Sequence, residues 1–259
     1  MAKLTSLAKM VKLAQQNEVA EQFVNDLLYT IESEDKEHNT YKPTQSFKPS
    51  GISGCLRCLF YEVSGATKDE ESKGTNLVGI CESGTDRHET IQNYIQAMSK
   101  HGIDCEWVNV GDYLKQQGIT DPQVIKQVGN ETKLYSVEYN MRFMCDGLIK
   151  YNGEYYIIEI KTESTHKYGK HSDAWDSHKL QATCYSMTIG VPNVIFIYEN
   201  RDNCDKKGFL VEVTDTMINQ VKYKINTVNK SIQDNTVPPR ETDKCTYCNY
   251  KTQCRKDGN

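Results

Sequence analysis

Residues 145–161, CDGLIKYNGEYYIIEIK, constrain the fold more than any other part of the chain. Asn152-Gly153 is the dipeptide most typical of a two-residue β-hairpin turn, and aromatic and β-branched residues lie on both sides of it. The sequence therefore predicts one strand over residues 141–151 and a second over residues 154–161, joined by a tight turn.

Three charged residues lie within or beside this apolar hairpin: Asp146, Glu159 and Lys161. Buried charges are costly unless they are paired or bind a metal. Because side chains alternate along a strand, Glu159 and Lys161 share one face, while Ile158 and Ile160 share the other. Asp146, on the neighbouring strand, can point to the same place. The pattern predicts a site for a hard cation at a sheet edge, with a positive group beside it.

The other segments predict helices and strands around this hairpin. His88 shares a helix face with Ile91 and Ile95, where a hydrogen-bonded core histidine is the simpler interpretation. Gln181 and Tyr185 share a face of a later helix that ends at Gly190. The sequence predicts helices over residues 1–34, 79–100 and 214–233, a short helix near 112–117, and a helix of about 17 residues that ends near 189. A further short helix within 50–65 would be capped by Ser50 or Ser53. The further strands begin at residues 134, 194 and 209. This order favours a mixed α/β sheet with helices on its faces.

Composition limits the classes of protein to consider. No run of about 18 apolar residues exists, and the N-terminus lacks a continuous apolar segment, so we expect neither a membrane span nor a signal peptide. The net charge is −4, so binding to nucleic acid would require a local positive surface. Residues 34–50 are polar and contain two prolines, which indicates a linker or irregular loop.

Ten cysteines suggest metal ligation, because disulfides are rare in chains without an export signal. Cys245, Cys248 and Cys254 form a C-x2-C-x5-C pattern, and either Cys55 or Cys58 can supply a fourth thiol. Sulfur ligation suits zinc or an iron–sulfur cluster, and the spacing does not decide between them. The isolated cysteines are expected to be buried free thiols: Cys81, Cys105, Cys184 and Cys204.

Taken together, these residues resemble the PD-(D/E)XK nuclease superfamily and, within it, the RecB-like branch with an iron–sulfur cluster. That branch includes CRISPR-associated RecB-like, AddB-like and phage exonucleases. Asp146 matches the motif aspartate, and Glu159-Ile160-Lys161 matches the E-x-K motif. Gln181 and Tyr185 match the Q-x3-Y motif, and His88 matches the metal-binding histidine.

The cysteines extend the resemblance towards both ends of residues 50–259. Cys55 matches the C-x-R start of the cluster motif, and Cys245, Cys248 and Cys254 match its C-terminal part. Phe143 departs from the family pattern, which often has glycine three residues before the aspartate, and Cys58 is an additional thiol. The resemblance implies a restriction-endonuclease-like mixed α/β domain over residues 50–259. Residues 1–49 would form a helical appendage and linker, and the C-terminal region would hold a cysteine-ligated cluster.

The resemblance also implies a function. His88, Asp146, Glu159 and the Ile160 carbonyl would bind Mg²⁺ or Mn²⁺, and Lys161, Gln181 and Tyr185 would complete the catalytic site. The expected enzyme is a deoxyribonuclease, most simply an exonuclease on single-stranded DNA or DNA ends. A 4Fe-4S cluster, or zinc in its place, would be structural.

The expected surroundings are the cytoplasm of a bacterial, archaeal or phage-infected cell, with recombination, replication or CRISPR-adaptation proteins as candidate partners. Lys167 and Lys170 could contact the DNA backbone, and a solvated basic loop is the alternative. Glu138 could serve as an outer or second-metal residue, although an exposed strand glutamate is simpler. Two other classes stay open: a catalytically silent DNA-binding or assembly module that keeps the cluster, and a zinc-binding interaction protein.

Overall fold

The computed structural model describes residues 2–38, 44–69, 74–241, 245 and 248–258. The chain divides into two compact units, Met1–Lys42 with Glu70–Ser83, and Pro43–Asp69 with Gly84–Asn259. The first unit holds helix α1 (Ala2–His38) and the first part of α3 (Thr75–Ala97). A boundary between residues 49 and 50 stays a prediction.

The long N-terminal helix is confirmed and is longer than the expected 1–34. Its described apolar side chains are exposed: Val19, Phe23, Val24, Leu27, Leu28 and Tyr29.

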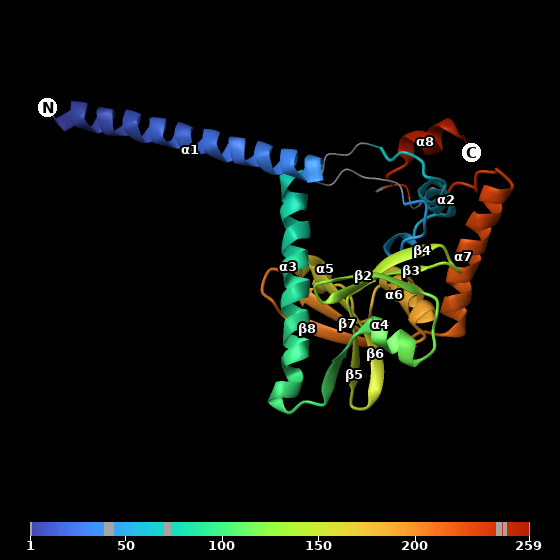
Figure 1. Ribbon diagram of the computed structural model, residues 1–259. Coiled ribbons are helices and arrows are strands. Elements are labelled where there is room, and N and C mark those ends of the chain that lie inside the picture. Colours follow the sequence, from blue (N-terminus) through green and yellow to red (C-terminus); the bar gives the residue numbers. More distant parts are fainter. Residues whose placement is uncertain (1, 39–43, 70–73, 242–244, 246–247, 259) are drawn as a thin grey trace. The chain divides into compact units, whose positions relative to one another are not determined.

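A five-stranded mixed sheet forms the centre of the second unit (Figure 1). Its strands lie in the order β1-β5-β6-β7-β8, and only β6 and β7 are parallel. A parallel pair requires a crossover connection, which here contains α5 (Thr165–Tyr168) and α6 (Asp176–Ile189). The strands are β1 (Cys105–Val108), β5 (Gly147–Tyr151), β6 (Glu154–Glu163), β7 (Asn193–Asn200) and β8 (Lys206–Glu212).

The predicted hairpin turn is confirmed. Asn152 and Gly153 both have positive φ angles, 50° and 86°, and Tyr151 pairs with Glu154 across a two-residue loop. This is the geometry for which Asn-Gly is selected. The turn therefore fixes the register between β5 and β6.

The prediction of one continuous strand over residues 141–151 was wrong, because the strand breaks at Asp146. Residues before the break form β4 (Met141–Cys145), which belongs to a separate antiparallel sheet in the order β2-β3-β4. The other strands of that sheet are β2 (Gln123–Val128) and β3 (Glu131–Ser136), and in Figure 1 all three lie above the five-stranded sheet. Asp146 thus lies where the chain passes from one sheet to the other.

Helices cover both faces of the five-stranded sheet. Apolar side chains of one face pack with α6 and α7 (Asp215–Gln233) in the largest core cluster, which includes Phe196 and Val221. Ile158 and Ile160 point to the other face and pack against Ile91 and Ile95 of α3. The predicted alternation along β6 is therefore confirmed.

The remaining segments include several corrections. Helix α2 (Leu56–Ser64) is capped by Cys55, whose thiol accepts a hydrogen bond from the Cys58 N–H, and not by Ser50 or Ser53. The basic loop that the sequence predicts over residues 162–171 instead holds the end of β6 and helix α5, and β1 and β2 were not predicted. Cys105 and Cys184 are buried as expected, whereas Cys81 and Cys204 are exposed. The other elements are η1 (Pro49–Gly51), η2 (Met98–His101), α4 (Val110–Gln116) and α8 (Lys251–Lys256).

The predicted fold class, a mixed α/β sheet flanked by helices with an N-terminal helix, is confirmed. Among the described residues, no helix combines the length and apolar character that crossing a membrane requires.

Candidate metal centre and cysteine cluster

Asp146 is held at the break between the two sheets by the backbone of β6. Its Oδ2 accepts a hydrogen bond of 2.8 Å from the Ile160 N–H, and Gln92 of α3 donates to its backbone carbonyl at 2.8 Å. The side chain is buried, and burial raises the pKa of Asp146 to about 7. The aspartate is therefore a fixed oxygen donor that loses its proton near neutral pH.

Glu159 lies on β6, on the face towards α6. Its Oε1 contacts Lys161 Nζ at 2.6 Å and accepts a hydrogen bond of 2.7 Å from Gln181 Nε2. Its Oε2 is buried and has no hydrogen-bond partner among the described residues. Burial, together with the charge of Asp146, raises the pKa of Glu159 to about 7. An unpartnered buried carboxylate oxygen is a candidate ligand atom.

Gln181 and Tyr185 present one face of α6 to this carboxylate. The Gln181 amide N–H also donates to the Tyr185 hydroxyl at 2.7 Å, and Gln181 Oε1 accepts a hydrogen bond of 3.2 Å from Lys161. Gln181 thus bridges Glu159, Lys161 and Tyr185, which fixes the orientation of its amide. The structure brings all four of these predicted residues together.

His88 comes to the site from α3, and an ion pair with a buried glutamate holds this part of the helix. Arg87 binds Glu199 of β7 through two contacts, Nε–Oε1 at 2.6 Å and Nη2–Oε2 at 2.8 Å, and Glu199 is fully buried. His88 Nδ1 lies 3.6 Å from Asp146 Oδ2. Burial lowers the pKa of His88, so the imidazole is neutral, as a metal ligand must be. The backbone of Ile160 forms a hydrogen bond with His88, which tends to raise that pKa.

Glu131, the first residue of β3, is a residue of this site that sequence reasoning missed. One ligand atom from each of His88, Glu131 and Asp146 lies within 4.8 Å of the others, and Glu131 Oε1 is 4.0 Å from His88 Nδ1. Burial raises the pKa of Glu131. Glu138, the glutamate that the sequence offers for an outer or second-metal role, is exposed beyond the end of β3.

The side chains at this centre fit a divalent cation. Two carboxylates and one imidazole converge, and Glu159, with its unpartnered oxygen, is near enough for the Asp146 charge to raise its pKa. Carboxylate oxygen suits Mg²⁺, and a nitrogen ligand in the same set suits Mn²⁺ equally well. The predicted ligands His88, Asp146, Glu159 and Ile160 thus lie around one place, with Glu131 in addition.

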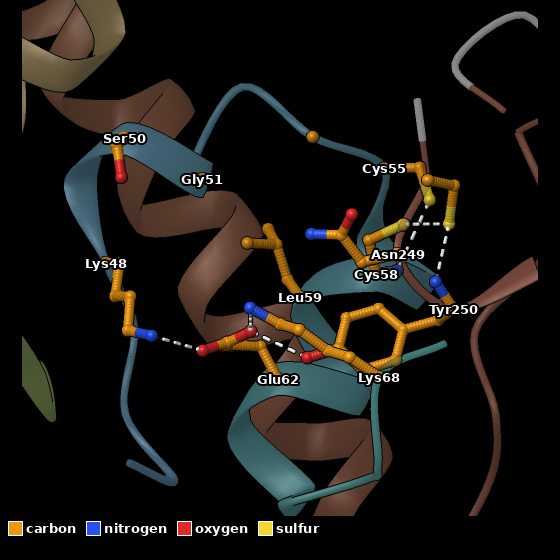
Figure 2. A pocket seen from close by; sticks show the side chains of 12 residues that line it. Lys48, Ser50, Gly51, Cys55, Cys58, Leu59, Glu62, Lys68, Asn249 and Tyr250 are labelled. Atoms are coloured by element: carbon orange, nitrogen blue, oxygen red, sulfur yellow. Dashed lines mark hydrogen bonds and ion pairs between the residues drawn. The ribbon is translucent and has the colours of Figure 1, made fainter. Parts of the chain in front are cut away.

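A second group of donors lies between α2 and the C-terminal segment. Cys58 Sγ is 3.1 Å from Cys248 Sγ, and Cys55, at the start of the same helix, accepts a hydrogen bond from the Cys58 N–H at 3.3 Å. A hydrogen bond from the Cys58 side chain is the main cause that lowers the pKa of the Cys55 thiol to about 6, and the Cys58 N–H lowers it further. Figure 2 shows Cys55 and Cys58 at one end of a pocket of about 390 Å³, with the Lys48–Glu62 ion pair at the other end.

The other two predicted cysteine ligands belong to the same region. Cys254 is buried, and Arg57 Nη1 lies 3.6 Å from its sulfur. The pKa of the exposed Arg240 is raised, first by a hydrogen bond with Cys245 and then by the Cys254 and Cys248 thiols. Short contacts thus join Cys55, Cys58 and Cys248, and arginines lie beside Cys254 and Cys245. Among the described residues, His88, Glu131 and Asp146 are the only group of three ligands placed to hold one ion, so a site at the five cysteines stays a prediction.

The two lysines predicted to contact DNA differ in their surroundings. Lys167 Nζ pairs with the buried Glu163 at 3.1 Å and lies over the Trp175 ring. Lys170 is exposed. A role for either in binding DNA stays a prediction.

Comparisons with known proteins give likenesses in structure only. No family model and no curated protein matches the chain. The solved structure of SSO0001 matches at a TM-score of 0.47 with 17% identity, covering 92% of this chain and 98% of that one.

A second solved structure is the alkaline exonuclease LHK-Exo from Laribacter hongkongensis. It matches at a TM-score of 0.42 with 13% identity, covering 74% of this chain and 90% of that one. The same exonuclease in complex with dAMP matches at a TM-score of 0.42 with 14% identity, covering 74% and 89%. Because these TM-scores lie below 0.5, what we propose for this chain rests on its own residues.

Proposed function

We propose that this chain is a divalent-metal-dependent deoxyribonuclease, most simply an exonuclease on single-stranded DNA or DNA ends. One observation carries the proposal: two carboxylates, Asp146 and Glu159, are buried together, Asp146 beside His88 and Glu159 with Oε1 on Lys161 and Oε2 unpartnered. Such a set is costly to bury unless a cation offsets the negative charge. The resemblance to RecB-like nucleases, carried by the sequence motifs, assigns the substrate class.

His88, Asp146, Glu159 and the Ile160 carbonyl would hold the cation, with Glu131 as a further oxygen donor. When bound, a divalent cation supplies Lewis-acid chemistry, which lowers the pKa of water and offsets phosphate charge. Asp146 is oriented by the Ile160 N–H, and Glu159 by Gln181, so both carboxylates are preorganised.

Lys161 is the partly exposed cation of the site, and its ammonium already contacts Glu159. It is suited to place a positive charge beside a scissile phosphate and to orient an attacking water. Gln181 accepts a hydrogen bond from this ammonium and so limits where it can point. Tyr185 is a neutral hydroxyl, because burial raises its pKa well above the ordinary value.

The cysteines would hold a structural 4Fe-4S cluster, with zinc as the alternative, that joins α2 to the C-terminal segment. The predicted ligands are Cys55, Cys245, Cys248 and Cys254. The contact between Cys58 and Cys248 makes Cys58 an equal candidate for the fourth position.

Digestion of end-labelled DNA tests the proposal. Wild type should shorten linear single-stranded DNA when Mg²⁺ or Mn²⁺ is added, and leave closed circles intact if it acts only on ends. Glu159→Gln and Lys161→Ala should lose at least about a hundredfold in rate, as loss of one preorganised transition-state contact predicts. Equal cleavage by the variants would place the chemistry elsewhere. No cleavage by a metal-loaded wild type would instead favour the silent DNA-binding module.

A further inference from the structure

The three-stranded sheet has one open face that leads directly to the metal centre. Along β3, Glu131, Lys133 and Tyr135 are half-buried and alternate with the buried Thr132, Leu134 and Ser136. Side chains on alternate residues share a face, so the first three define this one. Glu131, at its end, is the carboxylate near His88.

The register extends the face onto both neighbouring strands. Lys133 pairs with Lys126 of β2 on one side and with Met144 of β4 on the other. Tyr135 pairs with Arg142, whose guanidinium lies 4.3 Å from the Tyr135 ring centre. Residues directly opposite in an antiparallel pair point to the same face. The sheet face is therefore lined by Lys126, Lys133, Tyr135, Arg142 and Met144, with Glu131 at the metal end.

The charge of this face is the opposite of that of the whole chain. The chain carries a net charge of −4, whereas this sheet face combines three cations with one carboxylate, and that carboxylate belongs to the proposed metal site. Among the described residues, Lys126, Lys133 and Arg142 make no ion pair with an acidic side chain. Positive charge is thus concentrated beside the centre that would cleave a phosphodiester.

The pairing of Lys126 with Lys133 is a second, independent sign of an anion. Like charges placed directly opposite across two strands are destabilising, and neither lysine has an ion pair with a described carboxylate to offset the repulsion. A phosphate bound by both ammonium groups would remove that repulsion. Phosphate contacts of this kind fix the path of a nucleic acid without reading its sequence.

We propose that this sheet face is the track along which single-stranded DNA reaches the metal centre. Lys126, Lys133 and Arg142 bind successive backbone phosphates, and the exposed Met144, two residues before Asp146, contacts an unpaired base next to the site. In a single strand the bases are free to make such an apolar contact, whereas in a duplex they are paired and stacked inside the helix. That this single strand is the substrate rests on the proposed function, whereas its binding to the track does not depend on cleavage.

Binding measured without metal tests the track separately from catalysis. Fluorescence anisotropy of an end-labelled single-stranded oligonucleotide, in EDTA and over a salt series, gives the Kd and its salt slope for wild type and for Lys126→Gln/Lys133→Gln. The double variant should bind about tenfold more weakly, by a similar factor for oligonucleotides of different sequence. The slope of log K against log salt should become shallower by about 1.4, since each single-strand phosphate contact contributes about 0.7.

A control of equal charge is Lys100→Gln/Lys230→Gln, at exposed positions of η2 and α7. It should bind DNA like wild type and keep the wild-type melting temperature, whereas Lys126→Gln/Lys133→Gln, which removes a like-charge pair, should melt no lower than wild type. The track is overturned if the Lys126/Lys133 variant keeps the wild-type Kd and slope, if the control loses as much affinity, or if duplex binds more tightly than single strand. Wild type that binds through these lysines but never cleaves contradicts the proposed function and leaves the track standing.

Discussion

Glu131 is an additional oxygen donor beside the four ligands that we propose for the metal centre. Glu131→Gln keeps the shape of the side chain but removes an oxygen donor near His88 and Asp146. Loss of one supporting carboxylate should weaken Mn²⁺ binding about 10- to 100-fold, measured by calorimetric titration. Glu138→Gln, at an exposed glutamate in the turn after β3, is the matched control and should bind Mn²⁺ like wild type. Equal affinity for the two variants would remove Glu131 from the site.

The two buried carboxylates predict how stability depends on pH. Burial raises the pKa of Asp146 and of Glu159 to about 7, above the ordinary value near 4 in an unfolded chain. Between those values the folded metal-free protein binds more protons than the unfolded chain. The two carboxyl groups therefore stabilise the folded protein fully below about pH 4. That stabilisation is lost as the pH rises through about 7.

Thermal unfolding in EDTA from pH 4 to pH 8 measures this effect. Asp146→Asn/Glu159→Gln replaces both carboxylates with neutral groups and should flatten the decline in melting temperature seen for wild type. Mn²⁺ should raise the wild-type melting temperature more at pH 8 than at pH 5, because only deprotonated carboxylates bind it well. Parallel curves for the wild type and the double variant would contradict the assignment of the raised pKa values.

The sequence motifs were enough to predict the site residues that lie close together in the chain. Residues brought to the site only by tertiary packing, such as Glu131, were missed. Glu159 and Lys161 are two positions apart on one strand, so their shared face follows from alternation alone. Glu131 starts a strand in a segment without clear periodicity, and no local signal distinguishes it from Glu138. Its place near His88 depends on how β3 and α3 meet, which is a tertiary contact.

Among the elements, α3 carries His88 and is anchored by the Arg87–Glu199 ion pair. Arg87→Met leaves the buried Glu199 with Lys206, at 2.9 Å, as its remaining charged partner. We expect the free energy of unfolding in urea to fall by about 1–3 kcal/mol. Mn²⁺ affinity should fall as well, because the anchor lies next to His88.

Lys206→Met is the control for that variant, since it removes the other partner of Glu199 but lies on β8 and not on α3. It should lower stability with unchanged Mn²⁺ affinity. If both variants weaken Mn²⁺ binding to the same extent, the effect reflects general destabilisation and not the anchoring of α3.

Gly147, the first residue of β5, follows Asp146 and packs against the Trp107 ring. A Cβ at this position would lie 2.3 Å from Cη2 of Trp107, far closer than any real contact. Gly147→Ala should therefore lower the free energy of unfolding by about 1–3 kcal/mol, as overpacking does. Trp107→Leu in the same chain should recover part of the loss, which chemical denaturation of the two single variants and the double variant can measure. An additive double variant would show that Trp107 is not the obstacle.

At the scale of elements, the hairpin turn and the later helices were predictable because their signals are local. Asn152 and Gly153 in the turn, and Gly190 at the C-terminal end of α6, all have positive φ, which these residue types adopt at low cost. The separation of β4 from β5 was not predictable, because residues 141–151 are extended on both sides of Asp146. Which sheet a strand joins depends on its partners and not on its own sequence.

For the whole molecule, the proposed cysteine cluster would link α2 to the C-terminal segment, nearly two hundred residues later in the chain. Cys248→Ser should abolish bound iron or zinc, measured by elemental analysis, and lower the melting temperature, because the link between distant segments is lost. Cys204→Ser, at an exposed and isolated thiol, should change neither. Comparing Cys55→Ser with Cys58→Ser identifies the fourth ligand as the one whose loss releases the metal. Full metal content in Cys248→Ser would exclude the predicted site.

The central claim is that Asp146 and its neighbours form the metal centre of a DNA nuclease. Its most direct test is the single-turnover rate of cleavage of end-labelled single-stranded DNA as a function of Mn²⁺ concentration, for wild type, Asp146→Asn and the control Glu138→Gln. We predict a saturable dependence for wild type and Glu138→Gln, and no cleavage by Asp146→Asn at any Mn²⁺ concentration. Wild-type rates in Asp146→Asn, or cleavage by wild type that persists in EDTA, would contradict the claim.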